Sequence, residues 1–214
     1  MRNLPLFPLN TVLFPGGTIP LQVFEPRYLR LIDDCLNSDS KFGVVLIKEG
    51  KEVGGPSVPM SVGTIAKITS IKNLPNNRLL VTSIGTDRFN ILEILKNDPY
   101  MVASVDVQNE QTNEEIEDQT LKEATQSTGE YLQTLLAMQG GWIKNPSSSL
   151  PEKPLDLSFF MAQLIQQPTS DQQKMLETTS TINRLSDCTN IIKSESQKLV
   201  ARTKMDITLK FSRN

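Results

Sequence analysis

Five prolines fall within the first 26 residues, at positions 5, 8, 15, 20 and 26, set among apolar residues. Proline fixes φ and has no backbone N–H, so it is tolerated at strand edges and in turns but not at the centre of a sheet. The opening of the chain therefore predicts short apolar strands separated by fixed turns. A helix is expected to begin at Pro26, because proline suits the first turn of a helix.

The remainder of the first half also predicts β-structure. The expected strands have apolar or alternating patterns and cover residues 43–47, 62–71, 79–84, 88–95 and 100–107. Turn signals separate them, including Gly85-Thr86-Asp87, where the glycine is expected to supply an unusual φ and Phe89 a core side chain. Short strands at this spacing predict a closed or nearly closed antiparallel barrel, interrupted by the one helix.

The composition changes near residue 109, since nine of the 13 prolines and eight of the 11 glycines precede it. Five acidic residues between 110 and 118 indicate either the first turns of a helix or a disordered acidic linker. Helical spacing then continues to Gly140-Gly141, which should end the helix. Further helices are expected at about 156–167, at 170–178, where Ser170 and Gln173 are spaced as a capping box, and at 179–202. The prediction is an α+β protein, with a β-rich domain over 1–109 and a helical bundle over 110–214.

Composition excludes several kinds of chemistry. The chain has no histidine, the commonest general base and transition-metal ligand, and only two distant cysteines, which are expected to be buried and free. We therefore expect no metal site, no cofactor and no catalytic residue. The net charge of −2 lacks the basic excess of a nucleic-acid-binding protein. No apolar run is long enough to cross a membrane and no signal peptide is evident, so a cytoplasmic location is expected.

Several short motifs occur along the chain. Each motif alone is weak evidence for a family, but their order and spacing together are specific. In the first half they are Pro5-Leu6-Phe7-Pro8-Leu9, Leu13-Phe14-Pro15-Gly16, Val23-Phe24-Glu25-Pro26-Arg27-Tyr28, Phe42-Gly43-Val44-Val45, Val62-Gly63-Thr64-Ile65-Ala66 and Gly85-Thr86-Asp87-Arg88-Phe89. In the second half they are Leu157-Ser158-Phe159-Phe160-Met161-Ala162, Leu176-Glu177-Thr178-Thr179-Ser180 and Arg184-Leu185. Over most of its length the chain closely resembles the substrate-binding domain at the N-terminus of Lon proteases.

The resemblance implies a β-rich, barrel-like (PUA-like) domain joined to a helical bundle. It also implies a binding function linked to proteolysis. A catalytic function is not expected, because the sequence contains no phosphate-binding loop of an ATPase and no recognisable protease dyad. The leading hypothesis is a non-catalytic module that binds unfolded segments or peptides of other proteins. The side chains expected to contact such a peptide are Phe14, Arg27, Tyr28, Arg88 and Trp142.

Alternatives remain at this stage. The chain could be an adaptor or scaffold that docks onto a protease or another complex, or, less in keeping with its charge, an RNA-binding PUA-like protein. Glu25, Arg27 and Tyr28 could instead be structural, with Glu25 accepting from backbone N–H groups at the helix start and Arg27 pairing with an acid. Trp142 could fold back onto the helices or form an exposed anchor. The last helix could pack in its own bundle or against a second copy, which leaves the oligomeric state open.

Overall fold

The computed structural model describes residues 1–108, 110 and 115–211, with side chains up to residue 199. The chain divides into two compact units. Unit 1 comprises Met1–Glu110 and Gln167–Thr179, and unit 2 comprises Gln111–Gln166 and Ser180–Asn214. The expected division at residue 109 thus lies one residue from the end of the first segment of unit 1, but a segment expected in the helical bundle, 167–179, belongs to unit 1.

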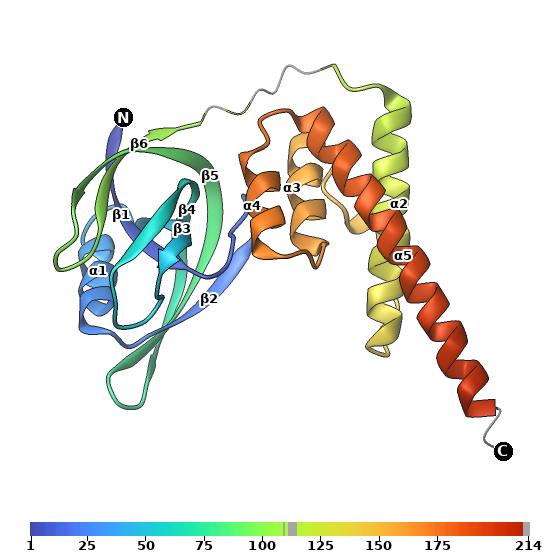
Figure 1. Cartoon of the computed structure of the whole chain (residues 1–214), viewed down its shortest axis with the longest axis horizontal. Coiled ribbons are helices and arrows are strands. Elements are labelled where there is room, and N and C mark those ends of the chain that lie inside the picture. Colours follow the sequence, from blue (N-terminus) through green and yellow to red (C-terminus); the bar gives the residue numbers. More distant parts are fainter. Residues whose placement is uncertain (109, 111–114, 212–214) are drawn as a thin grey trace. The chain divides into compact units, whose positions relative to one another are not determined.

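Unit 1 is built on one six-stranded sheet (Figure 1). Its strands are β1 (Arg2–Leu9), β2 (Thr18–Val23), β3 (Lys41–Gly50), β4 (Ser57–Leu74), β5 (Arg78–Lys96) and β6 (Val102–Val107). They lie in the order β2-β5-β4-β3-β1-β6, and the sheet curves so far that β6 also pairs with β5. The mixed α/β character, with one inserted helix, is confirmed. One pairing differs from the antiparallel arrangement expected, because β1 and β3 are parallel.

The inserted helix, α1 (Pro26–Leu36), begins at the proline that predicted it. Its buried face consists of Tyr28, Leu31, Ile32 and Cys35, and it packs against β1 and β3. The ring of Tyr28 stacks on that of Phe7 from β1, with the ring centroids 4.0 Å apart. These residues form one apolar cluster of the unit. A second cluster, around Leu6 and Phe89, joins β1 to β5 and β6.

The turn expected at Gly85-Thr86-Asp87 was wrong, because β5 runs through it without a break. Gly85 exchanges backbone hydrogen bonds with the segment before β2: its N–H donates to Gly17 and its carbonyl accepts from Gly16. Its φ is not in the left-handed region. A glycine is needed there because an added Cβ would overlap the carbonyl oxygen of Phe14. Phe89 is fully buried, as expected.

The short helix α4 (Thr169–Glu177) completes unit 1 and packs on β4. It begins after Pro168 without a side-chain cap, so the expected capping box of Ser170 and Gln173 was wrong. Gln173 is instead buried, and its amide nitrogen donates to the carbonyl of Val62 in β4 at 3.0 Å. A residue read as a local cap is thus a long-range contact.

Arg88 ties three segments of unit 1 together. The guanidinium pairs with the carboxylate of Glu110, at 2.6 and 2.8 Å, and donates to the carbonyls of Leu176 and Thr178 at the end of α4. Only 1% of Arg88 is exposed. A buried arginine requires such partners, because an unpaired charge in the interior is costly.

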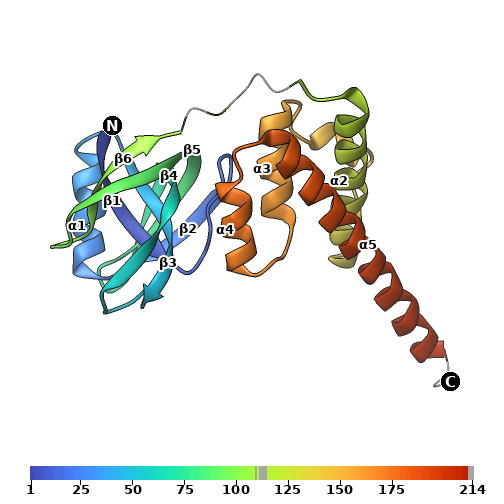
Figure 2. The same ribbon diagram turned by 45° about the horizontal axis from the view of Figure 1, so that its top comes forward.

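Unit 2 is helical. It contains α2 (Asp118–Met138), the 3-10 turn η1 (Pro146–Ser149), α3 (Pro154–Leu164) and α5 (Thr181–Phe211). Helices α2 and α3 both pack on α5 (Figure 2). The buried Arg184 of α5 lies over the ring of Phe159, 3.9 Å from its centroid, and donates to the hydroxyl of Ser158.

The acidic residues between the two halves of the chain lie in different structural settings. Asp118 lies in the first turn of α2, whereas Glu115 and Glu117 precede the helix and Glu110 pairs with Arg88. Glu114 lies outside the described residues. Both cysteines are buried and free, as expected. Within the helices that the structure describes, none combines the length and the apolar character needed to span a membrane.

Candidate functional site

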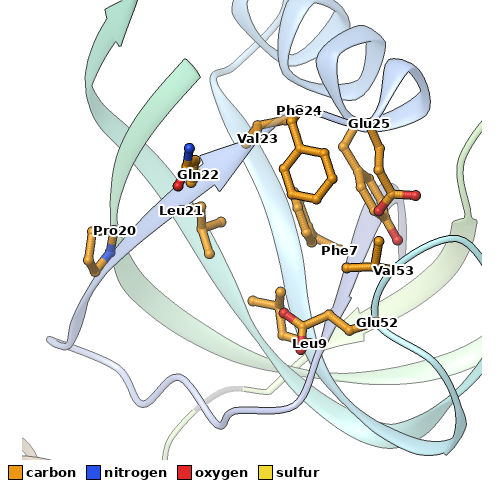
Figure 3. A pocket seen from close by; sticks show the side chains of 11 residues that line it. Phe7, Leu9, Pro20, Leu21, Gln22, Val23, Phe24, Glu25, Glu52 and Val53 are labelled. Atoms are coloured by element: carbon orange, nitrogen blue, oxygen red, sulfur yellow. The ribbon is translucent and has the colours of Figure 1, made fainter. Parts of the chain in front are cut away.

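A hollow of about 200 Å³ opens on the surface of unit 1 where β1, β2 and the start of α1 meet the loop between β3 and β4 (Figure 3). Its lining residues are Phe7, Leu9, Pro20, Leu21, Gln22, Val23, Phe24, Glu25, Tyr28, Glu52 and Val53. Pockets that enclose a drug-sized ligand are larger, roughly 300–1,000 Å³. The size therefore suits one or two side chains of a longer ligand better than a whole small molecule.

The floor of the hollow is apolar and rigid. Its residues are buried members of the cluster beneath α1, namely Phe7, Leu9, Leu21, Val23 and Tyr28. Alternation along β2 explains this, since Leu21 and Val23 point inward while Pro20 and Gln22 are exposed. The floor is therefore part of the packed core and does not have to form when a ligand arrives.

The rim adds two exposed apolar side chains. Phe24 is 49% exposed and Val53 is 54% exposed, although both are large apolar residues. Figure 3 shows Phe24 above the floor and Val53 beside Glu52, on the side of the hollow opposite Pro20 and Gln22. An exposed apolar rim over an apolar floor is the usual composition of a site that binds an apolar group.

The start of α1 fixes one wall of the hollow. Glu25 precedes the helix but makes no side-chain cap, contrary to expectation. Its carboxylate accepts from the Nε–H of Arg27 at 3.2 Å and from the backbone N–H of Gly54 at 3.2 Å, which holds the β3–β4 loop against the helix. Arg27 also lies over the ring of Tyr28, 4.5 Å from its centroid. Burial raises the pKa of Tyr28, against the opposing charge of Arg27, so this phenol stays protonated at neutral pH.

Two of the residues predicted from the sequence lie at the hollow. Tyr28 lines the hollow, and Arg27 supports its wall. Phe14 and Arg88 are buried within unit 1, where Arg88 holds Glu110 and the end of α4. Trp142 belongs to unit 2, where it is 71% exposed after α2, and stays a candidate for a separate contact.

Sequence reasoning missed most of the hollow. Its floor comes from α1 and from two strands that are not paired with each other, and the rim residues Glu52 and Val53 come from a loop with no motif of its own. One signal was available, because Phe24 is an apolar residue placed between the end of a strand and a helix start. Among the described residues, no group of three or more acidic, cysteine or histidine side chains could hold a metal ion.

Comparison with known proteins identifies the family. The family model of the ATP-dependent protease La (LON) substrate-binding domain matches residues 3–194. The chain belongs to the Lon substrate-binding domain family. Lon protease 2 of Myxococcus xanthus is 26% identical over 97% of this chain, and the Lon protease of Flavobacterium johnsoniae is 35% identical over 53% of it.

Solved structures of the Lon family share the fold. A Lon N-terminal domain protein from Xanthomonas campestris superposes with a TM-score of 0.67 at 26% identity, covering 87% of this chain and 96% of that one. The N-terminal domain of the Mycobacterium avium complex Lon protease also gives 0.67, at 18% identity, which supports the fold alone. The chain spans about a quarter of the length of Lon proteases such as that of Myxococcus xanthus. The match is thus to the substrate-binding part of Lon.

Proposed function

We propose that this chain binds unfolded or peptide segments of other proteins through the hollow of unit 1 and contributes no catalytic step of its own. The observation that carries the proposal is the preformed apolar floor beneath an exposed apolar rim, in a chain whose family is described as substrate-binding. A long apolar side chain entering the floor would be removed from water at about 25 cal/mol per Å² of apolar surface. Folded proteins rarely expose such side chains, so the site favours unfolded ones.

The absence of a closed cavity also supports a polypeptide ligand. The hollow has room for one or two side chains and opens on the surface of unit 1, with Pro20, Leu21, Gln22 and Val23 of β2 in its lining. A polypeptide supplies many apolar side chains in sequence, so weak capture at one site can still retain it. Binding in the micromolar range is therefore expected.

The test uses the full chain and a labelled, permanently unfolded protein, such as a reduced and alkylated one, with fluorescence anisotropy as the readout. Val53→Asp should weaken binding about ten-fold or more, because a carboxylate at the rim would lose its water on contact with an apolar ligand. Val58→Asp is the matched control: Val58 is 51% exposed, on β4, and does not line the hollow. Absence of binding, or equal weakening by the two variants, would disprove the proposal.

A further inference from the structure

The outer edge of β2 has free backbone groups beside the hollow. The N–H of Gly85 donates to the carbonyl of Gly17 at 2.8 Å, and Gly17 lies one position before the registered pair Thr18 and Ile84. Backbone groups alternate in direction along a strand, so the odd-numbered residues of β2 point toward β5 and the even-numbered ones point away. The N–H and C=O of Gln22, and the C=O of Pro20, are therefore directed outward.

No strand of the described chain occupies that edge. On the other side of the hollow, residues 6–9 of β1 pair with β3, and the pairing with β6 covers only residues 2–5. Pro8 in β1 and Pro20 in β2 each lack an N–H, which removes a donor from both strands and disfavours a direct ladder between them. The prolines that dominate the start of the sequence thus keep this edge open.

The side chains that line the hollow also favour positive charge on a ligand. Its lining residues include two carboxylates, Glu25 and Glu52, and no basic side chain. Glu25 is already paired with Arg27. Glu52 accepts one hydrogen bond from the backbone N–H of Asn10 at 3.2 Å and, in the described part of the chain, forms no ion pair. Figure 3 shows Glu52 facing β2 across the hollow.

We infer that the occupant is an extended polypeptide segment added as a strand to the edge of β2, with an apolar side chain in the floor and a lysine or arginine beside it against Glu52. Side chains alternate along a strand, so every second residue of the added segment would point the same way as Leu21 and Val23, toward the floor. A basic side chain two positions before or after the apolar one would point the same way and meet the carboxylate of Glu52 at the rim. This inference rests on the proposed function and adds to it the mode of binding and the class of segment preferred.

The experiment compares two labelled, unstructured peptides that differ only at the residues two positions before and after a central phenylalanine, lysine in one and glutamate in the other. The full chain should bind the lysine peptide about five-fold more tightly or better, and the preference should shrink as salt is raised. Glu52→Lys should reverse the preference. Glu49→Lys makes the same charge change on an exposed residue of β3 outside the hollow and should leave it intact.

A second series tests strand addition. N-methylation of one peptide amide at a time removes a donor without changing the charge. Binding should weaken at every second position, because only alternate amides of an added strand face β2.

The possible outcomes distinguish a failure of this inference from a failure of the proposed function. If both peptides bind equally and Glu52→Lys changes nothing, the preference for basic segments is wrong, but the proposed function stands. If N-methylation has no effect at any position, strand addition is wrong, but the proposed function stands. If neither peptide nor the unfolded protein binds, this inference and the proposed function both fail.

Discussion

At the scale of single residues, two members of one motif shared with the Lon family, Gly85-Thr86-Asp87-Arg88-Phe89, make contacts that are distant in sequence. Arg88 meets Glu110 and the end of α4, and Gly85 meets the backbone of Phe14. The sequence predicts Gly85 in a local turn and Arg88 as a peptide contact. Their surroundings make them structural, and each gives a prediction about stability.

Replacing Arg88 by methionine should lower the free energy of unfolding by about 3 kcal/mol. The substitution keeps much of the volume but leaves Glu110 unpaired and removes the donor from the carbonyls of Leu176 and Thr178. Urea unfolding measures the change. Arg30→Met is the matched control, because the side chain of Arg30 is exposed and its pairing with Asp34 is long, at 3.9 Å; it should cost no more than about 0.5 kcal/mol. Equal losses in the two variants would contradict the role given to Arg88.

Replacing Gly85 by alanine should cost about 1–3 kcal/mol, because the backbone of Phe14 must move away from the new Cβ. Gly55→Ala offers a comparison, since the nearest atom to a Cβ there is the Cβ of Lys51 at 3.6 Å, an ordinary contact. That variant should unfold within about 0.5 kcal/mol of the parent. The midpoints of thermal unfolding test both. A neutral Gly85→Ala would show that the segment before β2 is not held closely against β5.

At the scale of elements, α1 is held to the rest of unit 1 by polar contacts as well as by its apolar face, among them a contact with Tyr100. The hydroxyl of Tyr100, just before β6, donates to the carboxylate of Asp34 at 2.6 Å. Burial, with the hydrogen bond and the negative charge of Asp34, raises the pKa of Tyr100 to about 12. The fold therefore favours the protonated phenol.

This contact predicts how stability falls at high pH. In the unfolded chain Tyr100 ionises near its ordinary pKa of 10.0, but in the folded chain it ionises only near 12. Its contribution to the free energy of unfolding is therefore complete below pH 10 and is lost between pH 10 and 12. Tyr100→Phe should be less stable than the parent at pH 8, and the gap should narrow by up to about 2 kcal/mol by pH 12. Replacing Asp34 by asparagine should reduce, in part, the change of this stability gap with pH. Urea unfolding at a series of pH values measures this, and parallel curves for parent and Tyr100→Phe would refute it.

The elements themselves were largely predictable, because their signals are local. Pro26 marked the start of α1, and the apolar and helical periodicities located β3, β6, α3 and α4 to within a few residues. In contrast, β4 begins five residues earlier and α5 ends nine residues later than expected. The errors arose where a tertiary contact overrides a local signal. Gly85 was read as a turn because its partner, the backbone of Phe14, is 71 positions away in sequence from it. Gln173 was read as a cap because nothing local reveals its bond to Val62.

The site was predictable only in part for the same reason. Tyr28, with Arg27 beside it, was found because both belong to a conspicuous helix start. The floor residues look like any other strand residues in the sequence, and only the sheet order shows that β1 and β2 face each other without pairing. The sequence predicts that the prolines mark turns or strand edges; Pro8 and Pro20 lie inside β1 and β2, each in a stretch whose registered partners lie on one side. What they could not reveal is that the two edges border one hollow.

At the scale of the whole molecule, the chain enters unit 1 twice. It leaves after Glu110, returns at Gln167 and leaves again after Thr179. Arg88 contacts residues beside two of these crossing points, Glu110 and Thr178. The β-rich unit therefore depends on thirteen or so residues that arrive late in the chain, as the bounds Gln167–Thr179 show.

This dependence predicts that a fragment covering residues 1–110 is incomplete and can be repaired. It should unfold at a lower temperature than unit 1 in the full chain, because Leu176, Met175 and Gln173 no longer cover β4. Adding a synthetic peptide of residues 167–179 should raise its melting midpoint with peptide concentration. By mass action, a concentration one hundred times the Kd adds about 2.7 kcal/mol. A peptide carrying Leu176→Asp should have little effect, since it places a charge at a position that is 1% exposed. If the midpoint ignores both peptides, or responds to them equally, α4 is not an integral part of the unit that carries the proposed binding site.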